Sequence, residues 1–258
     1  MPHIAESTHW YAPDGSPAYE VKSLKGGMRP ATLRDARKLG LVPSVTSIIK
    51  CAAAPGLEHW KRQQVLMAAL TLPRMDGEPE SDWLERVMRD SGEQARKAAE
   101  RGTAIHAAIQ GHYEGTPPAE EFLPHVKGTA EAVGVWADAH PFNASWDAER
   151  SFCHPSGFGG KTDLSCDGRV LDFKSKEFSE DTKLDTYDEH HMQLASYREG
   201  LNMPSARCAI CYVSVTHPGL SRVIEIAEDD LQRGWNCFTS LLEYWKAKNR
   251  YDPLRKAA

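Results

Sequence analysis

The sequence predicts an α/β fold in which a sheet core follows a helical N-terminal elaboration. Residues 145–176 combine strand-like alternation with tight-turn residues, and two apolar strand-like runs follow at 207–215 and 221–227. The segment 229–248 places five large apolar side chains at helical spacing, which is typical of a helix that packs on a core. The order of helices, three strands, a helix, two strands and a helix therefore indicates a sheet covered by helices.

The part of the chain before residue 145 is expected to be mainly helical. Its first 41 residues are punctuated by Pro and Gly and are predicted to be irregular. Helical patterns are found there at residues 41–50, 57–70, 82–115 and 119–139, and a further one follows the predicted hairpin at 185–201. We therefore divide the chain into an N-terminal irregular and helical elaboration, residues 1–90, and a core, residues 91–258.

The net charge of −5 does not indicate a nucleic-acid binder, but the charges are unevenly distributed. Residues 1–62 contain nine Lys and Arg against five Asp and Glu, whereas the rest of the chain is acidic. This basic segment could contact a phosphate backbone, and an ordinary solvated surface explains it equally well.

Several classes of protein and site are not expected. No run of about 18 apolar residues occurs, so no membrane-spanning helix is predicted. Residues 1–16 contain neither an apolar signal segment nor an Arg-rich transit peptide, so a cytoplasmic location is expected by default. Cys208 and Cys211 have the spacing of metal ligands, but they lie in an apolar predicted strand without a second close pair. No zinc or iron–sulfur site is therefore expected.

A β-hairpin is predicted at residues 159–176, GGKTDLSCDGRVLDFKSK. Asp167-Gly168 at its centre favours a two-residue turn of type I′. Because such a turn fixes the register, the predicted pairs are Cys166 with Arg169, Ser165 with Val170, Leu164 with Leu171, Asp163 with Asp172, and Lys161 with Lys174. Side chains alternate along a strand, so Asp172 and Lys174 share one face of the sheet and the apolar residues around them face the other way.

Two aspartates side by side are destabilising unless they share a proton, pair with a cation or hold a metal ion. Lys174 could neutralise one of them, so a surface hairpin with an Asp–Lys ladder is one interpretation. If the loop 154–158 joins its flanking strands antiparallel, Glu149 comes level with Asp163 and adds a third carboxylate. Three carboxylates without a thiolate are suited to Mg²⁺ or Mn²⁺, and such an ion can generate a hydroxide nucleophile or stabilise a developing oxyanion.

Four sequence elements stand in a fixed order around the hairpin. The helical pattern ERGTAIHAAIQ (100–110) contains His106, the hairpin supplies GKTD and Asp172-Phe-Lys174, and HMQLASYREGL (191–201) contains Gln193 and Tyr197. This series resembles the PD-(D/E)XK nuclease superfamily, in particular its RecB-like branch. PSVTSIIK and LEHWKRQ also resemble the N-terminal region of phage exonucleases of that superfamily and of the mitochondrial genome maintenance exonuclease. The resemblance implies a restriction-endonuclease-like central mixed sheet flanked by helices.

The resemblance also implies an activity and a metal site. The expected activity is hydrolysis of DNA phosphodiester bonds from DNA ends by a metal-dependent exonuclease of phage or prophage recombination and repair. Asp163, Asp172 and His106 would hold one or two Mg²⁺ ions, which Mn²⁺ could replace, with help from the Phe173 carbonyl. Glu149 would complete the metal shell or orient its water.

Other residues would act on the substrate. Lys174 would position the attacking water and stabilise the charge on the reacting phosphate, while Gln193 and Tyr197 would align the strand. Basic residues near the predicted N-terminal helices are candidate phosphate contacts, namely Lys50, Lys61 and Arg62. The expected partners are DNA with a free end and a single-strand annealing protein, in the bacterial host cytoplasm if a phage encodes the chain.

Alternatives remain at this stage. An endonuclease, or a DNA-binding module of the same fold without catalysis, has the same sequence pattern, although the intact Asp163, Asp172 and Lys174 argue against the module. GGKT is not a phosphate-binding P-loop, because Pro155 stands where that motif needs glycine and a hairpin rather than a helix follows. The iron–sulfur nucleases of the RecB-like group have three clustered cysteines near the C-terminus, and this chain departs from that pattern.

Overall fold

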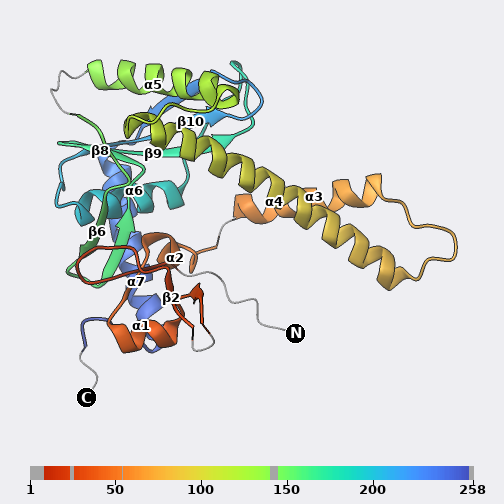
Figure 1. Ribbon diagram of the computed structural model, residues 1–258, viewed down its shortest axis with the longest axis horizontal. Helices are drawn as coiled ribbons and strands as arrows, with labels where there is room; N and C mark the ends of the chain where they lie inside the picture. The colour runs from red at the N-terminus through yellow and green to blue at the C-terminus, as the bar shows by residue number, and fades with distance from the viewer. Residues whose placement is uncertain (1–8, 24–25, 54, 140–144, 256–258) are drawn as a thin grey trace.

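The protein is described by a computed structural model that covers residues 9–23, 26–53, 55–139 and 145–255. A five-stranded mixed sheet with the order β11-β10-β9-β8-β5 lies at its centre (Figure 1). The strands are β5 (Asp147–Ala148), β8 (Leu164–Cys166), β9 (Arg169–Lys176), β10 (Arg207–Ser214) and β11 (Ser221–Glu225). β9 and β10 run parallel, and the other neighbours run antiparallel. The predicted α/β class, with a central mixed sheet flanked by helices, is confirmed.

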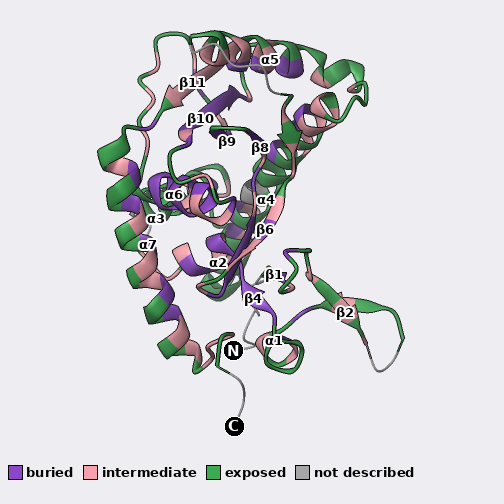
Figure 2. Cartoon of the chain, turned by 90° about the vertical axis from the view of Figure 1, so that its left-hand side faces the viewer, coloured by how far each residue is buried: buried purple, intermediate pink, exposed green. Residues whose placement is uncertain are grey.

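Helices cover both faces of this sheet. α4 (Glu80–Tyr113) and α5 (Leu123–Asp138), which follows the short η1 (Glu120–Phe122), contact one face. α6 (Asp188–Gly200) contacts the other face and is backed by α7 (Glu228–Asn249). Figure 2 shows buried central strands and an exposed outer surface on α5 and α7. The alternation of side chains along β9 separates the two hydrophobic clusters, because Val170 belongs to the cluster on the α6 side whereas Leu171 and Phe173 belong to the other.

The hairpin of β8 and β9 has most of its predicted register. The paired residues are Cys166 with Arg169, Ser165 with Val170, and Leu164 with Leu171. Gly168 has a φ of 76°, a conformation that the tight turn requires and that glycine adopts without steric cost. Local turn chemistry thus fixes the strand on which Asp172 and Lys174 lie.

The strands before the hairpin form a sheet of their own. β6 (Ser151–His154) and β7 (Phe158–Lys161) pair antiparallel, with Ser151 opposite Lys161. The N–H of Thr162 continues this pairing, donating to the carbonyl of Arg150 at 3.0 Å. The predicted pairing of Lys161 with Lys174 is therefore wrong, because the backbone partner of β7 is β6 and not β9.

Residues 9–23 and 26–41 are more regular than predicted. They contain β1 (Trp10–Tyr11), which pairs with β4 (Val42–Pro43), the hairpin of β2 (Glu20–Lys22) and β3 (Met28–Pro30), and α1 (Leu33–Leu39). α1 begins with a capping box, in which the carboxylate of Asp35 accepts from the N–H of Thr32 at 2.9 Å. Trp10 is buried with its ring edge against Trp245, at 6.0 Å between centroids. This segment therefore shares a core with α6 and α7.

Two helices project from the sheet as a hairpin, which we call the arm and define as residues 55–100. α3 (Pro55–Thr71) follows α2 (Val45–Ile49) and packs against the first part of α4, and Figure 1 shows the pair extending away from the sheet. The indole N–H of Trp83 donates to the carbonyl of Leu72 at 2.7 Å, and Arg86 donates to the carbonyl of Pro73 at 3.0 Å. α4 continues from the arm into the sheet layer, so the predicted domain boundary at residue 90 falls inside this helix.

Candidate active site

The two aspartates of the hairpin remain neighbours, although they do not form the predicted backbone pair. The β8–β9 ladder ends at Leu164 and Leu171. Asp163 precedes β8, and its Oδ2 accepts a 2.7 Å hydrogen bond from the backbone N–H of Phe173. The carboxylate thus satisfies a backbone donor of β9 where the ladder has ended. This contact holds Asp163 against the strand that carries Asp172.

Asp172 belongs to a network that joins β9 to α6. The side-chain amide of Gln193 donates to Asp172 Oδ1 and to the hydroxyl of Tyr197, each at 2.9 Å. Its Oε1 accepts from Lys174 Nζ at 3.1 Å, and Lys174 also forms an ion pair with Asp172. Gln193 and Tyr197 are four residues apart on α6 and therefore share the face that lies on the sheet. The structure thus brings together four of the residues that the sequence assigned to the site.

Burial and like charge act together on the carboxylate of Asp163. Burial raises the pKa of Asp163, the neighbouring Asp172 carboxylate raises it further, and Lys174 opposes the change. For Lys174, burial acts to lower the pKa, but the carboxylates of Asp172 and Asp163 outweigh it and the net shift is upward. Burial and the same two carboxylates raise the pKa of Tyr197 well above its ordinary value, so its phenol stays protonated. Lys174 is therefore a cation, while Asp163 has an increased tendency to bind a proton or a second cation.

His106 approaches Asp163 from the opposite side of the sheet. It lies on α4, with its Nδ1 3.9 Å from Asp163 Oδ2 and its ring edge-to-face with Phe173. Burial lowers its pKa, which favours the neutral imidazole that can ligate a metal ion. The helix comes close to β9 because Gly102 lacks a side chain, and a Cβ at this position would lie 2.5 Å from Ser175 Oγ. His106, Gly102 and Ser175 line a surface hollow of about 310 Å³.

Glu149 lies level with Asp163, as expected if the loop 154–158 joins its flanking strands antiparallel. The N–H of Glu149 donates to the carbonyl of Asp163 at 3.2 Å. Glu149 has a φ of 57°, so the strand is interrupted between β5 and β6 at this residue. Its carboxylate forms an ion pair with Lys161. The sequence predicted the position of the Glu149 carboxylate but not its ion pair with Lys161. The partner of Lys161 depends on which strand β7 pairs with, and this could not be predicted.

The donor set of this site fits a hard divalent cation. In the described ranges no three His, Cys, Asp or Glu side chains already form a metal-binding cluster. Yet Asp172 Oδ2 is buried, and within the same ranges it accepts no hydrogen bond and contacts Lys174 as an ion pair only. Carboxylate oxygens with a neutral imidazole are suitable ligands for Mg²⁺ or Mn²⁺, and a cation would relieve the repulsion between the two aspartates. The metal role of the Phe173 carbonyl stays a prediction.

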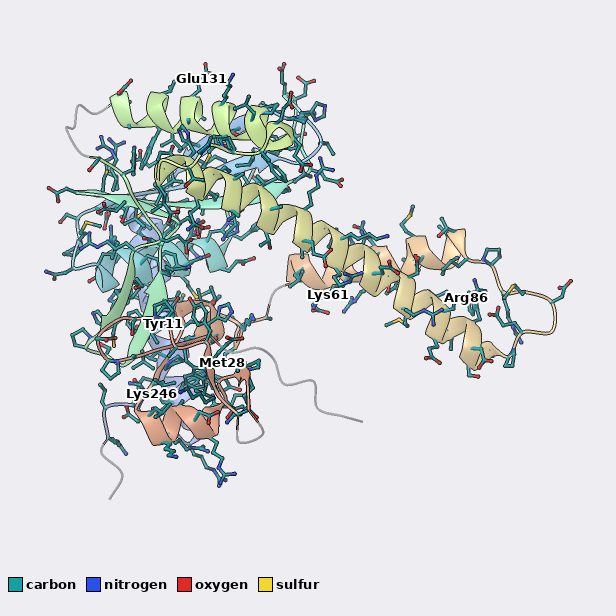
Figure 3. All side chains as sticks on the ribbon, in the orientation of Figure 1. Tyr11, Met28, Lys61, Arg86, Glu131 and Lys246 are labelled. Atoms are coloured by element: carbon teal, nitrogen blue, oxygen red, sulfur yellow. The ribbon has the colours of Figure 1, made fainter. Side chains whose placement is uncertain are left out.

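The three predicted phosphate contacts lie on two different helices. Lys50 is exposed at the C-terminal end of α2, close enough to His9 to contribute to the lowering of its pKa, after burial and together with Lys161. Lys61 and Arg62 are exposed near the start of α3, on the arm, and Lys61 Nζ pairs with Glu58 at 2.9 Å. Lys61 is labelled on the arm in Figure 3. The positions are compatible with contact to a phosphate backbone, and this role remains a prediction.

Aromatic side chains from the N-terminal segment also reach the site, and the sequence patterns did not reveal them. A Cβ at Gly159 would lie 2.6 Å from Cβ of Tyr11, and one at Gly160 would lie 3.0 Å from Cε1 of Tyr197. The two glycines of β7 thus bring the Tyr11 and Tyr197 rings against adjacent backbone positions. The only signal in the sequence was this Gly-Gly pair, which indicates close approach without identifying the partner.

Cys208 and Cys211 cannot chelate one ion in this fold. Both are buried on β10, but Cys208 packs in the cluster on the α6 side and Cys211 in the cluster on the other face. Burial raises the pKa of both thiols, for Cys208 to about 12. Their spacing reflects a strand that is buried on both faces.

Parts of two solved exonucleases are similar to this chain. A provisionally named exonuclease from Eubacterium rectale is 15% identical with a TM-score of 0.40, and the match covers 58% of this chain and 68% of that one. The alkaline exonuclease of Laribacter hongkongensis is 13% identical with a TM-score of 0.26, and the match covers 57% of this chain and 83% of that one. No protein-family model matches the sequence, and the comparison with curated proteins found no match. Likeness at this level concerns part of the fold, and the chemistry of the site rests on its own residues.

Within the described residues, none of the helices is both long enough and apolar enough to cross a membrane.

Proposed function

We propose that this chain is a divalent-metal-dependent nuclease that hydrolyses DNA phosphodiester bonds. The observation that carries the proposal is the close pair of half-buried Asp163 and buried Asp172 with Lys174 beside it. A surface Asp–Lys ladder would place these groups in water, whereas here the residue Asp172 is only 2% exposed. Burying charged groups is costly, so a function that needs them explains their position better than stability does.

The metal-binding residues in this proposal are the acids and His106. Asp163, Asp172 and the neutral His106 hold one or two Mg²⁺ ions, Mn²⁺ can substitute, and the Phe173 carbonyl assists. When bound, the metal supplies Lewis-acid stabilisation of the phosphoryl oxygens and lowers the pKa of bound water. Glu149 completes the donor set or orients a water, and its ion pair with Lys161 would have to open for direct ligation.

The remaining site residues act on water and on the DNA strand. Lys174 Nζ holds the attacking water and stabilises negative charge that develops on the phosphate. Gln193 fixes Lys174 and Asp172 at once through its carbonyl and amide groups, so it sets their relative position. The protonated hydroxyl of Tyr197 orients Gln193, and both side chains align the scissile strand. Lys50, Lys61 and Arg62 contact the phosphate backbone independently of its sequence.

The finer assignment follows the sequence resemblance. We propose attack from free DNA ends, as in phage or prophage exonucleases that act in recombination and repair, with a single-strand annealing protein as partner. The resemblance of PSVTSIIK and of the following basic helix to phage exonucleases supports this choice. Such an enzyme would act in the cytoplasm of a bacterial host.

The deciding experiment compares linear and covalently closed circular DNA. Each substrate is incubated with the wild type, Asp172→Asn or Asp167→Asn in the presence of Mg²⁺, Mn²⁺ or a chelator. We expect the wild type to degrade only linear DNA, and only with a metal ion. Asp172→Asn should lose activity by a factor on the order of 10³, because the change removes a charged metal ligand and leaves the shape unchanged. Asp167→Asn makes the same chemical change in the exposed turn of the same hairpin and should be fully active.

Each alternative has its own outcome. Equal attack on closed circles would identify an endonuclease. Unchanged cleavage by Asp172→Asn would remove the proposed metal site. Binding of DNA without metal-dependent cleavage by the wild type would identify a DNA-binding module of the same fold.

A further inference from the structure

Two aromatic rings of the N-terminal segment are stacked on each other near the candidate site. His9 and Tyr19 lie with their ring centroids 4.5 Å apart and their planes at 28°. His9 is exposed and Tyr19 is half-buried, so the rings are accessible to a ligand. We call this pair the His9–Tyr19 stack.

Backbone and side-chain contacts hold the stack in place. The carbonyl of His9 accepts from the N–H of Ser44 at 3.0 Å, and the carbonyl of Tyr19 accepts from the N–H of Ala31 at 2.8 Å. The hydroxyls of Tyr19 and Tyr11 are 2.7 Å apart. Rings that are fixed in advance lose little conformational entropy on binding, which suits a recognition surface better than a chance contact.

Contiguous contacts join the stack to the carboxylates. Tyr19 reaches Tyr11, whose ring lies against Gly159, and the next residue, Gly160, lies against Tyr197. Tyr197 is hydrogen-bonded to Gln193. Tyr19 is also close enough to Tyr197 to contribute to the raised pKa of that phenol, after burial and the two carboxylates. His9 is also close enough to Lys161, the ion-pair partner of Glu149, for that lysine to lower its pKa, so the stack lies near the Glu149 side of the site.

The charge around the stack matches a nucleotide. Burial lowers the pKa of His9, and Lys50 and Lys161 lower it further, so the imidazole is neutral and presents an uncharged aromatic face. Lys161 is already paired with Glu149, whereas Lys50 is an exposed cation at the end of α2. A base that stacks on His9 would place its phosphate within reach of Lys50. Aromatic faces combined with cations are the usual means of binding single strands without sequence preference.

We propose that the His9–Tyr19 stack binds an unpaired nucleobase of the strand that enters the site. This inference rests on the proposed nuclease function, since it names the single-stranded character of that substrate at the entrance. A base inside a duplex is stacked on both neighbours and cannot cover an external ring, so an internal nucleotide of the strand must be unpaired to stack here.

Binding in a chelator tests the proposal separately from cleavage. Fluorescence anisotropy measures the affinity of an oligothymidine and of a matched strand whose end nucleotides are abasic. We expect His9→Ala to weaken binding of the intact strand by on the order of tenfold and to leave the abasic strand unaffected. His9→Phe keeps the ring and should retain binding. Lys50→Ala should weaken both strands equally, because it removes a phosphate contact.

The opposite results are equally decisive. Equal affinities of the wild type and His9→Ala for the intact strand, or an equal loss on both strands, would overturn the stack as a base site. Tyr19→Phe provides a second variant that keeps the ring and loses only the hydroxyl, so retained binding is again expected. If Asp172→Asn abolishes cleavage while His9→Ala binds normally, the stack is wrong and the nuclease function stands. If His9→Ala shows base-dependent loss while the wild type never cleaves, the nuclease function is wrong.

Discussion

The hairpin site and the arm use charged side chains in opposite ways. At the site, Asp172 and Lys174 are held by Gln193 between β9 and α6, and Asp172 is almost fully buried. On the arm, ion pairs such as Lys61 with Glu58 and Arg96 with Glu100 connect residues three or four positions apart on exposed helix surfaces. Exposed pairs of this kind contribute little to stability, whereas buried charges are costly.

Apolar side chains show the reverse distribution. Around the site, Leu171 and Phe173 are buried in the core. The arm exposes large apolar side chains, among them Leu66 at 64% and Leu70 at 78%. The buried charges of the site therefore lower the stability of the fold. Substitutions on the arm, by contrast, should change the free energy of unfolding little. Substitutions at the site should therefore change chemistry, and substitutions on the arm should change binding or stability by small amounts.

Replacing Lys174 should have a large effect and should give the sharpest separation of chemistry from binding. We expect Lys174→Ala to lower the rate of DNA cleavage by about 10²- to 10³-fold, since it removes the cation beside the reacting phosphate. DNA affinity should change by no more than about threefold, because one of many phosphate contacts is lost. Lys176→Ala is the matched control, because Lys176 lies two residues further along the same face of β9. A comparable loss of cleavage in both variants would assign the effect to general charge and not to Lys174.

The acidic pair should make the stability of the metal-free protein depend on pH. The folded-state pKa of Asp163 is raised, so its contribution to stability is present at acidic pH and is lost as the pH rises through that raised value. Asparagine does not titrate, so the stability of Asp163→Asn should not fall as the pH rises through this range. As the pH rises from about 5 to about 8, the Tm of the variant should therefore increase relative to that of the wild type. Each kcal/mol of difference in the free energy of unfolding corresponds to about 2–4 °C in Tm.

A divalent ion should reverse this order. Mg²⁺ binds only the folded wild type and should raise its Tm at the higher pH, whereas Asp163→Asn should respond weakly. Thermal melts at both pH values, with and without Mg²⁺, measure the change. If the difference in Tm between the two proteins is the same at every pH, the pKa of Asp163 is not raised in the folded state. If neither protein responds to Mg²⁺, Asp163 is not a metal ligand.

The basic residues on the arm should have a smaller effect, confined to DNA binding. Lys61→Ala and Arg62→Ala should each weaken DNA affinity a few-fold and reduce the slope of log affinity against log salt by about 0.7–0.9. Arg89→Ala makes an equivalent change further along the arm, on α4, and should have no such effect if DNA passes near the start of α3. Salt-dependent binding titrations compare the three variants. Slopes of Lys61→Ala and Arg62→Ala that equal the wild-type slope would remove the start of α3 from the DNA path.

The predictable features are those set by neighbours in the chain. Asp167-Gly168 fixed the register of three residue pairs between β8 and β9, and the alternation of β9 placed Asp172 and Lys174 on one face. The helical spacing of Gln193 and Tyr197 placed both side chains toward the sheet. In each case a local rule of turn or helix geometry decided the outcome.

The features that could not be predicted depend on distant partners. Lys161 pairs with Glu149 because β7 joins β6, and no residue between 159 and 176 indicates that choice. Tyr11 comes from a segment without periodicity and packs in the space that Gly159 leaves, and ring contacts link Tyr19 to Tyr11 and His9 to Tyr19. Contacts of this type require the three-dimensional path of the chain, which no local pattern specifies.

The smallest effect is expected from replacing two glycines of α4. One lies in the arm and the other beside the site, so the two regions can be compared within one helix. Gly92 lies in the arm, is exposed, and a Cβ there would meet nothing within 4 Å. Gly92→Ala should therefore stabilise the protein by about 0.5–1 kcal/mol, the ordinary difference between glycine and alanine inside a helix. Gly102 lies beside the site, and a Cβ there would force the hydroxyl of Ser175 to rotate away.

The gain at Gly102→Ala should consequently be smaller, and a narrower hollow next to His106 should reduce metal-dependent stabilisation in that variant alone. Denaturant unfolding without Mg²⁺ measures the gain in stability of each variant, and unfolding with Mg²⁺ measures the additional stabilisation by the metal ion. Equal gains in stability and equal responses to Mg²⁺ would mean that the close approach of α4 to β9 is not needed to position His106. Because both substitutions are made in the same helix and with the same side chain, a difference between them reports the neighbouring strand and not helix propensity.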